Sequence, residues 1–229
     1  MKSSLSLVML STIALSLGFS WSRTPVTITP ASGPFKQTPE PVETGKIDEL
    51  IARLGSKSRE ERTRTENELL GLAARSLQTR RTIIDRLILR SEAMQLNRLQ
   101  ANSRDHFLVW LSANHLFQKL RATEAIDLLI TNINYGDGYT GNGSDHYPGK
   151  DSLIILGADA VPQLSKALLI NKDGWTRSQV ALCLGNIGGA EAKLALEHAL
   201  KTELDRDVVR YIEFSIATIS REQSHTKGE

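Results

Sequence analysis

The sequence predicts an all-α fold, an α-solenoid of about five helix pairs, and three observations support this class. Leu, Ala, Ile, Arg and Glu dominate the composition, while aromatic residues make up only 5%, which favours helices over strands. Apolar residues in the second half recur every three or four positions, which is the period of a helix. Segments with this pattern also repeat along the chain at intervals of about 32 residues.

Residues 1–22 have the layout of a secretory signal peptide. Lys2 provides a short basic start, and an apolar run interspersed with Ser and Thr spans residues 5–19. This run is short for a membrane span, which needs roughly 20 apolar residues. We therefore expect an exported protein, periplasmic or secreted, with no membrane span in the mature chain. The alternative is an uncleaved segment that tethers the protein to a membrane.

Residues 23–45 contain five of the seven prolines of the chain, together with several Thr and Ser residues. A segment of this composition without hydrophobic periodicity is typical of an extended, disordered linker. We expect the folded repeat domain to cover residues 46–220. The charged residues 221–229 are expected to form a flexible tail.

Two helix pairs are predicted in the first half of this domain. Residues 47–76 have the apolar pattern of one pair, and residues 80–90 and 105–120 have the pattern of the next. Residues 91–103 are expected to form a long connection between the two helices of the second pair. Trp110 lies in an apolar helical run, so we expect it in the core.

The second half contains three first helices that align with one another, beginning at Glu124, Asp159 and Glu191. Their matching residues lie 35 and then 32 positions apart: Ala125, Ala160 and Ala192; Leu129, Leu164 and Leu196; Ile133, Leu168 and Leu200. The second helices match at a spacing of 32 residues, with Val180, Leu184 and Ile187 before Ile212, Ile216 and Ile219. A unit of helix, turn, helix and turn is therefore expected to recur.

The turns carry residues that suit helix ends. Asp173 and Asp205 precede second helices, where a side-chain oxygen can cap the free N–H groups of the first turn. Gly157, Gly188 and Gly189 stand where second helices end, a place that favours a left-handed backbone conformation. Both features predict helix boundaries at these residues.

The motifs of residues 156–219 resemble HEAT repeats, especially the short bacterial kind called HEAT-like repeats of phycobilisome lyases. The resemblance is strongest over residues 122–220, and it is carried by the LGADAVPQLSKAL helix, the ALCLGNIGGAEA junction and the Asp-to-Arg steps Asp173/Arg177 and Asp205/Arg210. It implies a curved stack of helix pairs with an extended surface for peptides or proteins. Such a scaffold supplies no chemistry by itself.

The sequence NYGDGYTGNGSDHYPG, residues 134–149, is an insertion in the third unit, where a long connection joins the first helix to a second helix starting near Pro148. Calcium binding through the hard oxygen ligands of Asp137, Asn142 and Asp145 is one interpretation, although the order of an EF-hand loop is missing. A tolerated surface insertion is another. Recognition of a partner by the tyrosines is the third.

The partner-binding interpretation names six residues, five in this connection and one at the start of the helix near residue 175. They are Tyr135, Asp137, Tyr139, Asp145, His146 and Trp175. We expect them to contact a protein or peptide.

No catalytic, cofactor-binding or metal-ligating pattern is found. The single cysteine, Cys183, lies in an apolar helical run, and the five histidines lack the spacing of a metal site. The sequence therefore favours an exported, non-enzymatic scaffold that mediates protein–protein interaction. One alternative is a lyase-like or chromophore-handling enzyme, as the family resemblance implies. Another is nucleic-acid binding through the Arg-rich first half, which interleaved acidic residues and the export signal disfavour.

Overall fold

The computed structural model describes residues 41–96, 104–136 and 147–225, and every regular element in these ranges is helical. The chain divides into residues 1–37 and 38–229, and the helices belong to the second unit. The expected signal peptide lies outside the described residues. The α-helices are α1 (Pro41–Arg53), α2 (Arg59–Ala73), α3 (Leu77–Leu96), α4 (Arg104–Lys119), α5 (Ile126–Thr131), α6 (Pro148–Leu156), α7 (Val161–Ile170), α8 (Gly174–Ile187), α9 (Gly189–Leu200) and α10 (Arg206–His225).

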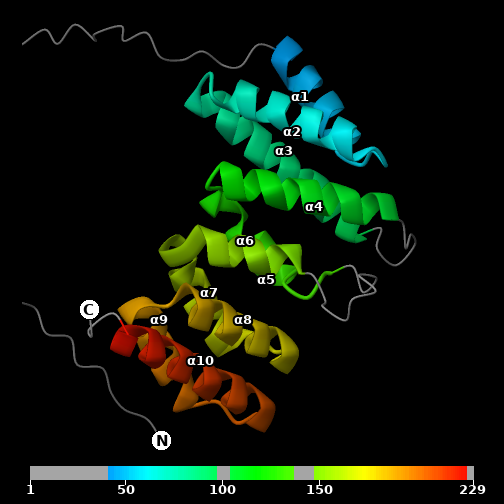
Figure 1. Cartoon of the computed structure of the whole chain (residues 1–229). Helices are drawn as coiled ribbons and strands as arrows, with labels where there is room; N and C mark the ends of the chain where they lie inside the picture. The colour runs from blue at the N-terminus through cyan, green and yellow to red at the C-terminus, as the bar shows by residue number, and fades with distance from the viewer. Residues whose placement is uncertain (1–40, 97–103, 137–146, 226–229) are drawn as a thin grey trace, which may run out of the picture. The chain divides into compact units, whose positions relative to one another are not determined.

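Helices pack on their neighbours in a regular order along the chain (Figure 1). Each odd-numbered helix contacts the even-numbered helix that follows it. The even-numbered helices also contact one another in series, from α2 through α4, α6 and α8 to α10. Among the odd-numbered helices, α1 contacts α3, α5 contacts α7, and α7 contacts α9. The prediction of an all-α class is confirmed.

The repeated apolar positions form the core between these helices. Ala125, Ala160 and Ala192 are fully buried, and so are Leu129, Leu164 and Leu196. Burial of one leucine side chain stabilises a fold by roughly 1.5–3 kcal/mol. The sequence repeat is therefore a repeat of buried positions, because the same face of each first helix packs inward.

The helix boundaries predicted at Asp173, Asp205, Gly157 and Gly188 are confirmed. The Asp173 carboxylate accepts hydrogen bonds from the backbone N–H of Thr176 at 2.9 Å and from its hydroxyl at 2.6 Å. Asp205 accepts from the N–H groups that open α10 in the same way. Gly157 and Gly188 have φ angles of 68° and 71°, a left-handed conformation that glycine adopts without strain.

Three boundaries differ from the prediction. Helix α3 continues through residues 91–96, where a connection was expected, and Ser91 and Met94 are buried there. Helix α10 extends to His225, so most of the expected flexible tail is helical. Helix α1 begins at Pro41, ahead of the expected start at Lys46. No glycine or proline interrupts the added residues of α3 and α10, and strong helix formers such as Glu and Ala continue them.

Helices α8 and α10 approach each other closely at a pair of small residues. A Cβ atom added to Gly185 would lie 2.7 Å from the Cβ atom of Ser215, closer than real carbon atoms come. The absence of a side chain at this glycine lets the two helices meet. Cys183 and Leu184 are fully buried beside it.

In the described residues, Pro148–Ile170 is long and apolar enough to cross a membrane by length and composition alone. The left-handed Gly157 separates α6 from α7 within this stretch. Leu153 on α6 and Leu164 on α7 are fully buried in the core. These side chains pack between helices. A helix in a protein core can be as long and as apolar as a helix that crosses a membrane.

Candidate protein-interaction site

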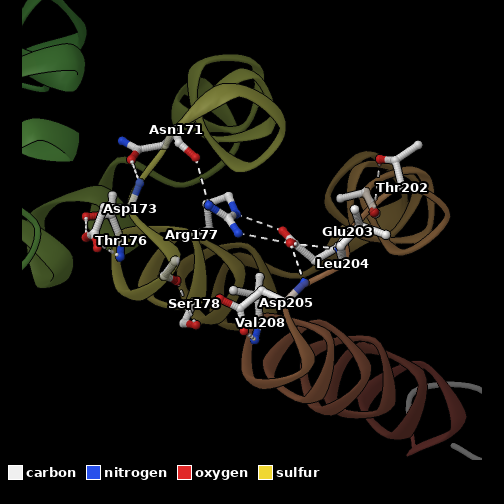
Figure 2. Close-up of polar contacts among 12 residues, drawn as sticks. Asn171, Asp173, Thr176, Arg177, Ser178, Thr202, Glu203, Leu204, Asp205 and Val208 are labelled. Carbon is white, nitrogen blue, oxygen red and sulfur yellow. Dashed lines mark hydrogen bonds and ion pairs between the residues drawn. The ribbon is translucent and has the colours of Figure 1, made fainter.

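An arginine joins the turn before α8 to the turn before α10 (Figure 2). The Nε and Nη2 atoms of Arg177 donate to the two carboxylate oxygens of Glu203 at 2.7 and 2.9 Å. Its Nη1 atom donates to the backbone carbonyls of Asn171 and Lys172 at 2.9 and 3.2 Å. One guanidinium group therefore binds the turns within two successive helix pairs, and its planar shape suits the two-point contact with the carboxylate.

Glu203 in turn fixes the backbone of the α9–α10 turn. Its Oε1 atom accepts from the N–H groups of Leu204 and Asp205, both at 3.0 Å. The side chains of Arg177 and Glu203 are only 14% and 10% exposed. Hydrogen bonding from Arg177 is the main cause that lowers the pKa of Glu203, and the bond to Glu203 raises the pKa of Arg177. Both groups are therefore charged at neutral pH.

A cleft of about 520 Å³ lies between the end of α7 and the α9–α10 turn, and we call it the α7–α9 cleft. Arg177 and Glu203 line it together with apolar side chains, Leu169 and Ala199 among them. Leu204 lines it as well and is 92% exposed, while Leu169 is 44% exposed. The cleft thus combines a paired polar group with accessible apolar side chains.

Leu204 occupies a position that is a lysine in the two comparable turns. Lys57 and Lys172 directly precede the N-cap residues of α2 and α8, as Leu204 precedes Asp205. Single exposed leucines are common on protein surfaces. This one differs because its own backbone N–H is bound by Glu203, which holds the turn in place.

The predicted partner-binding residues fall into separate environments. Tyr135 is partly buried against the core, and its ring lies 6.0 Å from that of Phe107 and 6.1 Å from that of Trp110. Trp175 is half exposed, and its ring meets Tyr211 edge-on at 6.3 Å. Asn134, which precedes Tyr135, donates a hydrogen bond to Thr176, which follows Trp175.

The other four predicted residues, Asp137, Tyr139, Asp145 and His146, lie outside the described residues. Of the two predicted residues that the structure describes, neither Tyr135 nor Trp175 lines the α7–α9 cleft. Trp110, expected in the core, is buried.

The pair of Arg177 and Glu203 was missed as a site, although a spacing signal exists. An arginine follows the capping serine of α2 by four residues, at Arg62, as Arg177 follows Asp173. Arg62 likewise donates through Nη1 to the two carbonyls of the preceding turn, at 2.7 and 3.2 Å. The expected equivalent, Arg210, lies five residues after Asp205 and pairs with Asp207 instead.

The described residues hold no group of three or more His, Cys, Asp or Glu side chains that could bind a metal ion. Cys183 is fully buried, and burial raises the pKa of its thiol to about 12. The thiol is therefore protonated at neutral pH and shielded from reactants, which agrees with its expected place in the core.

Comparison of the sequence with models of protein families and with curated protein sequences gives no match. The resemblance to HEAT repeats therefore rests on the sequence motifs alone.

Proposed function

We propose that the chain is an exported, non-enzymatic scaffold that stacks its helix pairs as an α-solenoid of HEAT-like repeats and binds another protein. The α7–α9 cleft is the observation that carries this proposal. It presents Leu204 to solvent on a turn that Arg177 and Glu203 fix, and it presents Leu169 near the end of α7. Exposed apolar groups on a rigid frame favour binding, because less conformational freedom is lost on association.

The order of helix contacts supports the stacked arrangement. In a repeat protein each unit packs only on its neighbours, and the units together offer an extended surface to large partners. The even-numbered helices follow this rule from α2 to α10, and the odd-numbered helices follow it from α1 to α3 and from α5 to α9.

The contacts of Arg80 and Arg62 make these two arginines poor candidates for nucleic-acid binding. Arg80 donates to the carbonyls of Leu120 and Arg121 at 2.6 and 3.1 Å and to Glu124 at 3.3 Å. Arg62 is bound to its own turn in a similar way. Arginines held within the domain are less free to contact phosphates, which dominate nucleic-acid affinity.

The proposal is tested by photo-crosslinking in the cells that produce the protein. A photoreactive amino acid replaces Leu204 in one variant, Trp175 in a second and Leu77, which is 85% exposed on α3, in a third. We expect a specific crosslinked protein from position 204 and none from position 77. The same crosslinking with a variant that lacks residues 136–145 shows whether the insertion contributes to partner binding.

Two results would refute the proposal. One is the lack of any specific crosslinked protein at all three positions. The other is turnover of a substrate by the purified chain that substitution of a few polar residues abolishes. Export is tested separately by measuring the mass of the mature protein, since cleavage near Ser22 removes the first segment.

A further inference from the structure

The acidic side chains of the α7–α9 cleft are already engaged within the protein. Glu203 is bound by Arg177 and by two backbone N–H groups. Asp205 accepts from the N–H groups of Asp207 and Val208 at the start of α10, where the helix dipole offsets its negative charge. These two carboxylates therefore contribute little free negative charge to the cleft.

The lysines that flank the cleft, in contrast, have no carboxylate partner within the described part of the chain. Lys172 follows the cleft residue Asn171, and Lys201 precedes the cleft residue Thr202. Lys166 lies one helical turn before Leu169 on α7. All three are exposed, and the ion pairs of the described residues do not include them.

The apolar residues of the cleft are close neighbours of these lysines along the chain. Leu169 and Leu204 are exposed at its edge, and Leu168 and Ala199 are buried in its wall. An apolar side chain that enters the cleft would cover both exposed leucines. At roughly 25 cal/mol per Å² of apolar surface removed from water, this contact favours binding.

We propose that the α7–α9 cleft binds a segment of a partner protein in which leucine-like side chains are flanked by Asp or Glu. The inference rests on the proposed function, since it names the kind of partner that the scaffold takes. The apolar side chains enter the cleft, and the carboxylates pair with Lys172, Lys201 and Lys166. Charges at the rim steer the partner to the site, and the apolar contact holds it there.

Three short fluorescent peptides test the charge preference. They carry leucines at the same positions, with glutamate, glutamine or lysine at all the others. Binding to the full-length protein is measured by fluorescence anisotropy at low and high salt. We expect the glutamate peptide to bind about tenfold tighter than the glutamine peptide at low salt, with the difference shrinking at high salt. The lysine peptide is expected to bind weakest.

Three variants test the place of binding. Leu204→Ser should weaken the binding of the glutamate peptide by about tenfold or more, because it removes a central apolar contact. Leu77→Ser is the matched control, since Leu77 is equally accessible but lies on α3, and it should bind as the unaltered protein does. Lys172→Glu combined with Lys201→Glu should reverse the preference in favour of the lysine peptide. All three variants alter exposed side chains, and circular dichroism checks that they fold.

Equal binding of the glutamate and lysine peptides, or unchanged binding by Leu204→Ser, would overturn the inference. If no peptide binds while a photoreactive group at position 175 still captures a partner, the cleft assignment fails and the scaffold function stands. If position 175, position 204 and position 77 all capture nothing, the proposed function itself fails.

Discussion

At the scale of single residues, the ion pair of Arg177 and Glu203 joins the α7–α8 turn to the α9–α10 turn. Substitution Arg177→Met would leave a largely buried carboxylate without its partner and would release two backbone carbonyls. We expect a loss of about 1–3 kcal/mol in the free energy of unfolding, measured by urea denaturation.

Arg210→Met is the matched control for this substitution. Arg210 is also an arginine that follows a capping aspartate, but its contact with Asp207 is long, at 3.4 Å, and both side chains are largely exposed. Its removal should change the free energy of unfolding by no more than about 0.5 kcal/mol. Equal effects of the two substitutions would show that the pair of Arg177 and Glu203 has no special role in stability.

The same pair makes a prediction about pH. The pKa of Glu203 is lower in the folded state than in the unfolded chain, so the unfolded state binds its proton first as the pH falls. The stability that Glu203 provides is therefore complete above the unfolded value of about 4.3 and is lost as the pH drops through the lower folded value. The free energy of unfolding of the unaltered protein should fall more steeply between roughly pH 5 and pH 3 than that of Glu203→Gln, because these pKa values set that window. Parallel curves for the two proteins would contradict this assignment.

At the scale of elements, the contact between α8 and α10 depends on Gly185. Alanine is the better helix former by roughly 0.5–1 kcal/mol, so Gly185→Ala would stabilise an isolated α8. In the protein the added methyl group would meet Ser215 at 2.7 Å, and the two helices would have to separate. We expect a net loss of about 1–3 kcal/mol in thermal or urea unfolding.

Gly71→Ala, on α2, distinguishes the packing effect from helix propensity. A Cβ atom added to Gly71 would have no heavy atom within 4 Å, so only the propensity gain applies. This variant should be slightly more stable than the unaltered protein. A stabilised Gly185→Ala variant would mean that α8 and α10 are not in close contact.

At the scale of the whole molecule, the sequence was informative wherever one local rule decides the structure. Helix period placed the buried residues Leu129, Leu164 and Leu196, and capping chemistry placed Asp173. The boundary of α3 was missed because residues 91–96 lack a strong period and can be either helix or connection. The α7–α9 cleft was missed because it joins residues from separate turns, and the partner of Arg177 lies 26 positions away.

The proposed stacked arrangement predicts that the C-terminal helices can open without unfolding the rest of the chain, because each helix pair would depend mainly on its neighbours. Cys183 is the only cysteine, and α10 packs on the helix that carries it. Its thiol should react with a labelling reagent only when this part opens. We expect the free energy of opening from the labelling rate to be smaller than the free energy of global unfolding measured in urea. Arg177→Met should reduce the opening free energy further, since it removes the link between the α7–α8 and α9–α10 turns. Equality of the two free energies would show instead that the described helices unfold as a single cooperative unit.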